Sequence, residues 1–463
     1  MLSLIAAASL LFIALLVYKF AYAPYGALRK MGVNGPTPRP FWGNAREFIE
    51  DFFVHGVNEK LGLPPSIVIS RGEEWKNSRQ AFSPTFTGGK MKQMIPVLLK
   101  CVDNLQADLE TFAVSGETID IKSHFGVFIT ESILAVAFGR QVDLHSSDGP
   151  EDPLTKATRT FFDLQRPGSE APNIFTIITL RSQLPFISHL MPYFVPKAME
   201  DSFRFLYETA KALIKTRRDE NNSVKHDDFL QLMLDLETEN GSTQNATPTD
   251  LFSNNDLISH CITFLLAGQE TTASCLAYTS YLLAINPDVQ EKLCQELDNY
   301  FKDHSISTGI YEATHDIKYL DMVVQESLRL FPPAALIVGR MSTDKVQLGG
   351  LDIPKGTAVI VPVMSIHQDQ KIWEDPENFK PERFAAEEKQ KRPQLCHLPF
   401  GWGPRNCVGM RFALMEAKMT LIRILQKYKF VRALETEVPL QTIMAGLILQ
   451  PKNGIFLKIQ PRN

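Results

Sequence analysis

A ten-residue segment near the carboxyl end limits the possible folds more than any other feature, because it places one cysteine in a glycine-rich loop directly before a helix. The segment is Phe400-Gly401-Trp402-Gly403-Pro404-Arg405-Asn406-Cys407-Val408-Gly409, and an apolar pattern of helical period follows it. Its glycines let the backbone approach a flat partner closely, and the helix start supplies N–H groups that favour a thiolate. Phe400 can shield the sulfur from water, and Pro404 stiffens the loop.

A fixed cation in the same loop completes a pattern typical of heme ligation. Arg405 lies two residues before Cys407, and its planar guanidinium suits a carboxylate. A thiolate, a cation for a carboxylate and a glycine-lined loop together predict that Cys407 is the axial ligand of a heme iron. Phe400, Arg405 and Gly409 would line the cofactor. The other cysteines form no CxxC pair, which favours structural roles for them and a reducing compartment.

Helical periodicity dominates the rest of the chain. The 463 residues are 44% hydrophobic and 22% charged with a net charge of −4, as in a globular protein with no electrostatic reason to bind nucleic acid. Short β-type segments occupy 346–348, 358–363, 447–449 and 455–459. We therefore predict a mainly α-helical domain with small β-sheets. The expected helices are 75–80, 91–112, 128–138, 197–219, 227–237, 256–285, 287–302, 320–330 and 409–428.

The amino terminus has the pattern of a membrane anchor. Residues 2–18 form an uncharged, mostly apolar run that would rise about 25 Å as a helix, nearly enough to cross a bilayer core. Basic residues follow this run, so the positive-inside rule places the bulk of the chain in the cytoplasm. We predict a transmembrane signal anchor at 1–23, a proline-rich hinge at 24–40 and a catalytic domain at 41–463. A cleaved signal peptide is the alternative, because residues 21–23 (Ala-Tyr-Ala) resemble a cleavage site.

Together with two further motifs, the cysteine loop resembles the cytochrome P-450 family, and the resemblance extends over nearly all of the chain. Glu326-Ser327-Leu328-Arg329 is similar to the family's ExxR motif, and Pro381-Glu382-Arg383-Phe384 is similar to its PERF motif. The glutamate and the arginine of ExxR share one helix face, and the PERF arginine can complete a buried ionic triad. The resemblance implies a cytochrome P-450 fold with a structural triad of Glu326, Arg329 and Arg383.

A second catalytic element is predicted in the long helical stretch, at Ala267-Gly268-Gln269-Glu270-Thr271-Thr272. From the residues alone, Glu270 and Thr271 are more often an exposed acid and a threonine bonded back to its own helix. The resemblance reverses this interpretation, because the segment is similar to the family's oxygen-activation motif. It implies that Ala267 and Gly268 leave room for a ligand or dioxygen, and that Glu270 and Thr271 relay protons.

Three residues distant from the cysteine loop are further candidates for holding the heme propionates. Trp75 and Arg79 are one helical turn apart and offer an indole N–H and a guanidinium. Their assignment depends on the resemblance to the family's helix at this place. Arg340 follows Phe331-Pro332-Pro333 at about the separation where the family often has another propionate ligand.

The chain looks most like the animal microsomal branch that contains thromboxane synthase and the family-three drug-metabolising enzymes. Segments 74–76, 83–87, 229–233 and 451–454 are similar to that group. Between residues 40 and 75 the chain departs from the pattern, because it is several dozen residues too short for the first sheet strands and the loop over the substrate. Substrate preference is therefore not carried over.

The resemblance implies a heme-thiolate monooxygenase that inserts one atom of O2 into a lipophilic small molecule. The cofactor would be heme b (iron protoporphyrin IX). Electrons from NADPH would come through NADPH–cytochrome P-450 reductase, with cytochrome b5 as a further partner, because the chain has no flavin or nicotinamide fingerprint. The expected location is the endoplasmic reticulum membrane. The alternatives are a peroxide isomerase or dehydratase, which Thr271 disfavours, and an inactive shortened heme-binding form.

Overall fold

The computed structural model describes residues 64, 66–68, 70–163, 197–220, 226, 228–241, 253–335, 339–445 and 448–462. The predicted anchor at 1–23 and hinge at 24–40 lie outside the described residues. The chain divides into two units, and the described part of the smaller one is Gly339–Val361. The described residues of the larger unit come from Leu63–Pro167, Lys197–Val338 and Pro362–Asn463, so this unit contains the cysteine loop.

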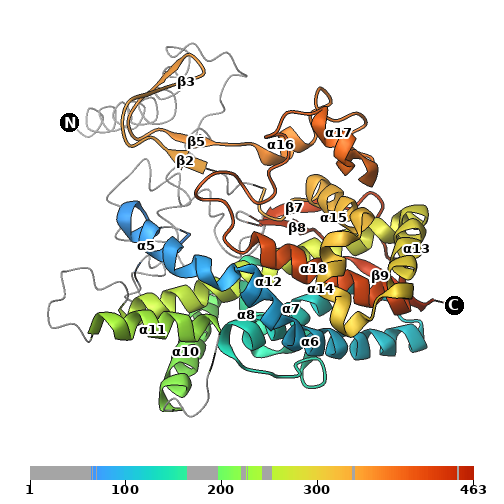
Figure 1. Cartoon of the computed structure of the whole chain (residues 1–463), viewed down its shortest axis with the longest axis horizontal. Coiled ribbons are helices and arrows are strands. Elements are labelled where there is room, and N and C mark those ends of the chain that lie inside the picture. Colours follow the sequence, from blue (N-terminus) through green and yellow to red (C-terminus); the bar gives the residue numbers. More distant parts are fainter. Residues whose placement is uncertain are drawn as a thin grey trace, which may run out of the picture. The chain divides into compact units, whose positions relative to one another are not determined.

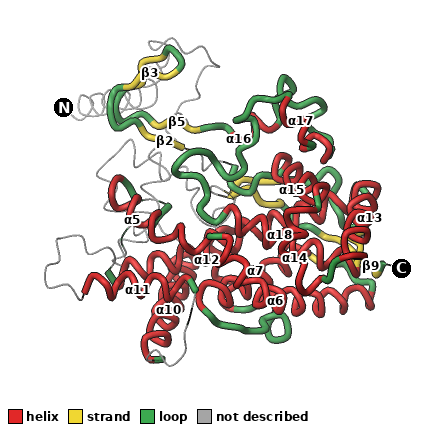
Figure 2. Tube along the Cα trace, in the orientation of Figure 1, coloured by secondary structure: helices red, strands yellow, loops and turns green. Residues whose placement is uncertain are grey.

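Helices make up most of the larger unit, which confirms the predicted mainly α-helical fold class (Figures 1 and 2). Among the described residues they are α5 (Gly72–Phe82), α6 (Gly88–Ser115), α7 (Ile121–Phe138), α8 (Pro153–Asp163), α10 (Lys197–Asp219), α11 (Phe229–Gly241), α12 (Asn254–Ile285), α13 (Pro287–Asp303), α14 (Ile306–Asp316), α15 (Lys318–Leu330), α16 (Val363–His367), α17 (Ala386–Gln390) and α18 (Met410–Lys427), with 3-10 helices η3 (Ser83–Phe86), η4 (Gly149–Glu151) and η6 (Pro381–Phe384).

The central element of this unit is α12, which packs against α7, α10, α15 and the strand at 428–432. Ser253 and Asp256 form a reciprocal capping box at its start, so two backbone N–H groups there are satisfied. The helix ends at Ile285, and Pro287 begins α13 two residues later, because proline is favoured in a first turn and disfavoured inside a helix. Most α12 side chains are buried, which explains why its apolar pattern surrounds the helix.

The neighbouring helix α7 is a core helix. It is apolar on all sides and, alone among the described helices, is long and apolar enough to cross a membrane. However, 83% of its apolar window is buried inside the protein, which indicates a core position. It ends at Phe138, and the next residue, Gly139, has a φ of 63°, a left-handed conformation that glycine adopts without strain.

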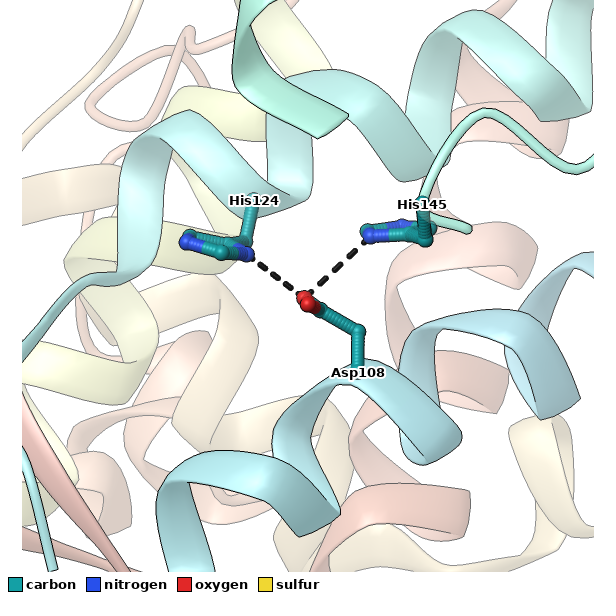
Figure 3. Close-up of side chains that lie close together, drawn as sticks. All are labelled: Asp108, His124 and His145. Carbon is teal, nitrogen blue, oxygen red and sulfur yellow. Dashed lines mark hydrogen bonds and ion pairs between the residues drawn. The ribbon is translucent and has the colours of Figure 1, made fainter. Parts of the chain in front are cut away.

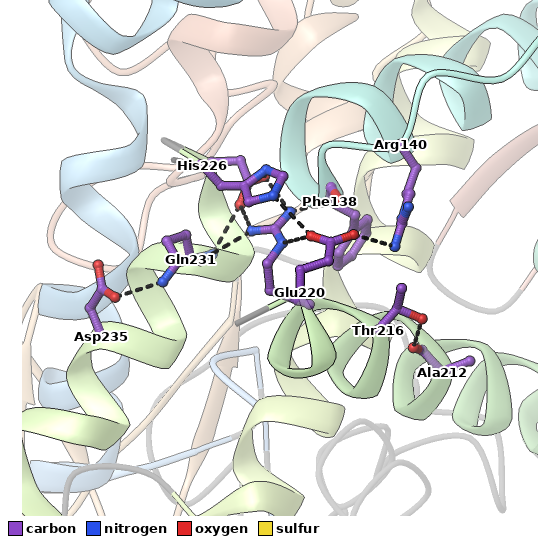
Figure 4. A network of polar contacts seen from close by, with 10 residues as sticks. Phe138, Arg140, Ala212, Thr216, Glu220, His226, Gln231 and Asp235 are labelled. Atoms are coloured by element: carbon purple, nitrogen blue, oxygen red, sulfur yellow. Dashed lines mark hydrogen bonds and ion pairs between the residues drawn. The ribbon is translucent and has the colours of Figure 1, made fainter. Parts of the chain in front are cut away.

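A polar network ties the end of α7 to α10 and α11 (Figure 4). Arg217 of α10 donates to both carboxylate oxygens of Asp228, at 2.8 and 2.6 Å, and to the carbonyl oxygen of Phe138 at 2.9 Å. A Cβ on Gly139 would lie 2.7 Å from Asp228 Oδ2. Glycine is therefore needed at this position for the close approach as well as for the turn.

The β structure consists of small antiparallel sheets. In the larger unit, β1 (Ile119–Asp120), β9 (Phe456–Pro461) and β6 (Tyr428–Arg432) form one sheet in that order, and β7 (Thr442–Ala445) pairs with β8 (Ile448–Pro451). In the smaller unit, β2 (Gly339–Met341) pairs with β5 (Ala358–Ile360), and β3 (Val346–Leu348) pairs with β4 (Leu351–Ile353). Tyr278 of α12 donates to the carbonyl oxygen of Leu449 at 2.9 Å, which fixes β8 beside α12.

Candidate active site

The cysteine loop has a closed backbone geometry. The N–H of Cys407 donates to the carbonyl oxygen of Phe400 at 2.9 Å, and the N–H of Asn406 donates to Gly403 at 3.0 Å. Gly401 and Gly403 have φ angles of 72° and 81°, which are strained for residues with a Cβ. These contacts place Cys407 three residues before Met410, where α18 begins.

Of the six cysteines, Cys407 alone is exposed, and the other five are buried. The sequence predicts a thiolate favoured by the helix start. Burial of the sulfur outweighs this effect and raises the pKa of the Cys407 thiol, although the N–H of Gly409 and the charge of Arg79 lower it. The sulfur is therefore surrounded by protein on most sides, while the residue still presents surface to solvent. A metal ion that binds this sulfur would take the place of its proton.

Two cations and one indole ring gather at this loop, as the motifs predict. Arg79 of α5 donates to Asn406, with Nη1 2.6 Å from the carbonyl oxygen and Nη2 2.9 Å from Oδ1. The guanidinium of Arg405 lies over the ring of Trp75, 4.3 Å from its centroid, and donates to the carbonyl oxygen of Ser70 at 3.0 Å. The structure thus brings together three of the four residues assigned to the propionates.

The fourth of these residues, Arg340, lies on β2 in the smaller unit. It pairs with Val359 across the strands, and its Nη1 donates to the carbonyl oxygen of Gly339 at 2.7 Å. Its assignment to a propionate stays a prediction.

Aromatic side chains connect the end of the loop with α12. A Cβ on Gly409 would lie 3.8 Å from the ring of Phe86, an ordinary contact distance. The Phe86 ring stacks on Phe264 of α12 with centroids 5.9 Å apart, and it lies 6.2 Å from the ring of Phe412 of α18. The cysteine loop, η3, α12 and α18 therefore share one packed region.

The oxygen-activation segment presents two different surfaces of α12. Ala267 is exposed and Thr271 is partly exposed, and the two lie one turn apart on the same face. Thr271 Oγ1 donates to the carbonyl oxygen of Ala267 at 2.7 Å. A Cβ on Gly268 would lie 2.9 Å from Cδ1 of Ile133, so the glycine lets α12 approach α7 closely.

Glu270 lies in a different environment from Thr271, although the two are adjacent in sequence. Its side chain is only 2% exposed, and its Oε1 is 2.6 Å from Nζ of Lys122 on α7. Gln450 of β8 donates to the same oxygen through Nε2 at 2.9 Å. No sequence motif indicated Lys122 or Gln450 as partners of Glu270. The one sequence signal for a buried ion pair was Lys122 itself, a lone lysine at the start of an apolar helix.

The three charged residues assigned a structural role form a buried triad. Arg329 donates to both carboxylate oxygens of Glu326, through Nε at 2.7 Å and Nη2 at 2.8 Å, and both side chains are fully buried. Nε of Arg383 lies 3.3 Å from Glu326 Oε1. Arg329 also donates to the carbonyl oxygen of His367 at 2.7 Å. The triad thereby joins α15, η6 and α16.

These features fit a heme with a cysteine ligand. The loop offers the one exposed cysteine, two guanidinium groups lie beside it for the carboxylates, and glycines leave the backbone without side chains at the turns. The class of protein that this fold and this site define is a helical heme-thiolate protein.

Comparison with known proteins identifies the family. A model of the cytochrome P450 family matches residues 45–458. Cytochrome P450 3A12 of Canis lupus familiaris is 34% identical over 496 residues, which cover 97% of this chain and 95% of that protein. Cytochrome P450 3A5 of Homo sapiens is 34% identical over 495 residues, with the same two shares. Cytochrome P450 3A30 of Fundulus heteroclitus is 33% identical over 497 residues. The chain belongs to the cytochrome P450 family.

Family membership confirms the predicted enzyme class, because the chain is a cytochrome P450 monooxygenase, an oxidoreductase. It also implies a heme-thiolate cofactor. The 496 aligned positions exceed the 463 residues of this chain, so the alignment contains gaps in this chain. This agrees with a chain shorter than its relatives. The placement of the missing segment between residues 40 and 75 stays a prediction.

Proposed function

We propose that this monooxygenase inserts one atom of O2 into a lipophilic small molecule at a heme held by Cys407. The observation that carries the proposal is the hydroxyl of Thr271 on the accessible face of α12, in the segment that resembles the family's oxygen-activation motif. An isomerase that rearranges peroxides needs no proton delivery, so a hydroxyl at this position supports the oxygenase over the isomerase.

Each residue of the site has a stated task in this proposal. Cys407 provides the sulfur ligand, while Arg79, Arg405 and Trp75 hold the propionates through charge and hydrogen bonds. When bound, heme supplies the oxygen chemistry, and thiolate ligation favours O–O cleavage. The Thr271 hydroxyl donates to the Ala267 carbonyl oxygen; to deliver this proton it would turn away from that carbonyl and take a replacement proton from solvent at the accessible face of α12.

Glu270 has a positioning task in the proposal. Its carboxylate is buried against Lys122 and Gln450, so it holds α12 in place against α7 and β8. A direct part in proton transfer would need this ion pair to open. We therefore assign proton delivery to Thr271 and the support of the helix to Glu270.

The remaining parts of the proposal concern partners and location. Electrons come from NADPH through a membrane-bound reductase, with cytochrome b5 as an accessory donor, and the segment at 1–23 anchors the chain in the endoplasmic reticulum membrane. The similarity to relatives named cytochrome P450 3A supports this assignment.

The first experiment tests the heme ligand. The reduced, CO-bound protein should give the red-shifted Soret band of thiolate ligation. Cys407→Ala should remove this band, and the matched variant Cys396→Ala should keep it, because Cys396 is a buried thiol outside the loop. A band that survives both substitutions would refute the ligand assignment. A parental protein that takes up heme without giving the band would support the inactive alternative.

The second experiment tests the reaction. With reductase and NADPH, Thr271→Ala should lower the product formed per NADPH from lipophilic test compounds by about tenfold or more, because proton delivery contributes at least this much. The matched control is Thr263→Ala. Like Thr271, Thr263 donates through Oγ1 to the backbone carbonyl oxygen four residues earlier in α12, here that of Ser259 at 2.9 Å. Conversion of a lipid peroxide without NADPH, unchanged by Thr271→Ala, would favour the isomerase instead.

A further inference from the structure

Three side chains outside the heme site converge at one place in the larger unit (Figure 3). Asp108 comes from α6, His124 from α7 and His145 from the segment that follows α7. Each offers one atom that can bind a metal, and these atoms lie within 4.8 Å of one another. The carboxylate lies between the two rings, with Oδ2 2.5 Å from His124 Nδ1 and 3.2 Å from His145 Nδ1.

The surroundings hold these groups in position. The His145 side chain is only 3% exposed, and among the described residues neither its Nδ1 nor its Nε2 has a hydrogen-bond partner, so its 3.2 Å approach to Asp108 is an ion-pair distance alone. The N–H groups of Leu144 and His145 donate to Oε1 of Glu131 at 2.5 and 3.3 Å, which fixes the backbone that carries His145. The ring of Phe112 packs edge-on against His124, with centroids 5.1 Å apart. These are supporting contacts of the kind that orient metal ligands.

The Asp108 carboxylate faces both histidine rings. Burial raises the pKa of Asp108, but the hydrogen bond from His124 and the charges of the two nearby histidines outweigh this effect and lower the pKa to about 2. Both histidines approach the same oxygen, Oδ2 of Asp108, and His124 lies closer to it than His145 does. Asp108 therefore orients the His124 ring more firmly than the His145 ring. A dication between the three groups would give each of them a ligand bond.

We propose that Asp108, His124 and His145 form a binding site for Zn²⁺, separate from the heme. Two imidazole nitrogens and one carboxylate oxygen are a typical zinc donor set, and water would complete a tetrahedral site. The ion would hold α6, α7 and the segment after α7 to one another. Asp108 and His124 are 16% and 12% exposed, so an ion can reach the site from solvent.

The three side chains must shift to bind an ion, because their donor atoms lie within 4.8 Å of one another and not all at the separations of tetrahedral ligands, so the two histidine nitrogens must also adjust their separation. Tetrahedral zinc ligands at about 2.0–2.1 Å from the ion lie about 3.3 Å from one another. The separation of Asp108 from His145 already has this value, at 3.2 Å. The separation of Asp108 from His124 is a hydrogen-bond distance of 2.5 Å and must widen by about 0.8 Å, which a small side-chain rotation provides.

The test uses the heme-loaded full chain, dialysed free of zinc and titrated with ZnCl2 by calorimetry. We expect one zinc per chain, and we expect Asp108→Asn and His145→Ala to weaken binding by at least about tenfold. His315→Ala is the matched control, because His315 is an exposed histidine on α14. MgCl2 should give no binding at this site, since Mg²⁺ requires oxygen ligands in octahedral geometry.

Asp108→Asn preserves the shape of the side chain, so it remains informative if His145→Ala fails to retain heme. A second measurement needs no variant. Zinc should slow proteolytic cleavage within residues 139–148 of the parental chain, because the ion holds His145 to α6 and α7. The proposal is overturned if the parental chain binds no zinc, or if the affinities of Asp108→Asn, His315→Ala and the parental chain agree within about twofold.

Discussion

Replacing Lys122 by methionine should destabilise the protein strongly, because it leaves Glu270 buried without its cation. The two side chains are 11% and 2% exposed, and Nζ lies 2.6 Å from Oε1. Methionine keeps most of the apolar stem, so the change removes the charge with little loss of packing. Gln450 at 2.9 Å and Ser274 at 3.5 Å would be the remaining partners of this carboxylate.

The magnitude follows from burial. Removing one partner of a buried ion pair costs about 3–5 kcal/mol, whereas an exposed pair contributes about 0–1 kcal/mol. The remaining hydrogen bond from Gln450 offsets part of the loss, since a hydrogen bond to a charged group contributes about 1.5–3 kcal/mol. We therefore expect Lys122→Met to lower the free energy of unfolding by about 3 kcal/mol.

The assay is urea unfolding of the heme-loaded protein, followed by circular dichroism. Lys92→Met is the matched control, because its ion pair with Glu312 at 2.9 Å is 56% and 47% exposed, so its loss should leave the free energy of unfolding nearly unchanged. Combining Lys122→Met with Glu270→Gln should recover part of the stability, because no buried charge is then left unpaired. Equal effects of Lys122→Met and Lys92→Met would refute the reasoning.

Three further outcomes are expected. Glu326→Ala should lower the free energy of unfolding by about 3–5 kcal/mol, because it leaves the buried guanidinium of Arg329 without its carboxylate partner. Thermal unfolding measures this loss. Burial raises the pKa of Glu416 to about 8 from 4.5. Unfolding then releases a proton between these values, so stability falls by about 1.4 kcal/mol per pH unit as pH rises, and Glu416→Gln should abolish this slope in unfolding measured at several pH values. Gly268→Ala should lower the free energy of unfolding by less than about 1 kcal/mol, because alanine's better helix propensity offsets part of its contact with Ile133, and Ile133→Val should relieve this contact in the double variant; strict additivity would contradict this.

Long helices could be predicted from the sequence because the burial of α10 follows the helical period, and because α12 is a long, mostly apolar stretch without an internal proline. The prediction at 256–285 differs from α12 by two residues, and the one at 197–219 matches α10. The helices α8 and α14 were missed, as were the five-residue helices α16 and α17. The first has only eleven residues, and the second contains Gly309 with several hydroxyl side chains, so neither gives a long apolar pattern.

The groups around the cysteine loop were predictable because short motifs name them. Trp75, Arg79 and Arg405 meet at the loop in the structure, as the motifs suggest. The ion pair of Glu270 was not predictable, since its partners lie 148 and 180 residues away in the sequence. A buried charge indicates that a partner exists, but no local pattern indicates which residue it is.

Glu270 and Thr271 are consecutive, yet one helical step turns them toward different surroundings, one sealed among long-range partners and one accessible. Evolution can therefore act on the two positions independently. Replacement of Glu270 should require matching changes at Lys122 or Gln450, so these three positions should covary among relatives. The hydrogen bond of Thr271 goes to the backbone of its own helix, so the residue type at this position should instead follow the reaction that each relative performs.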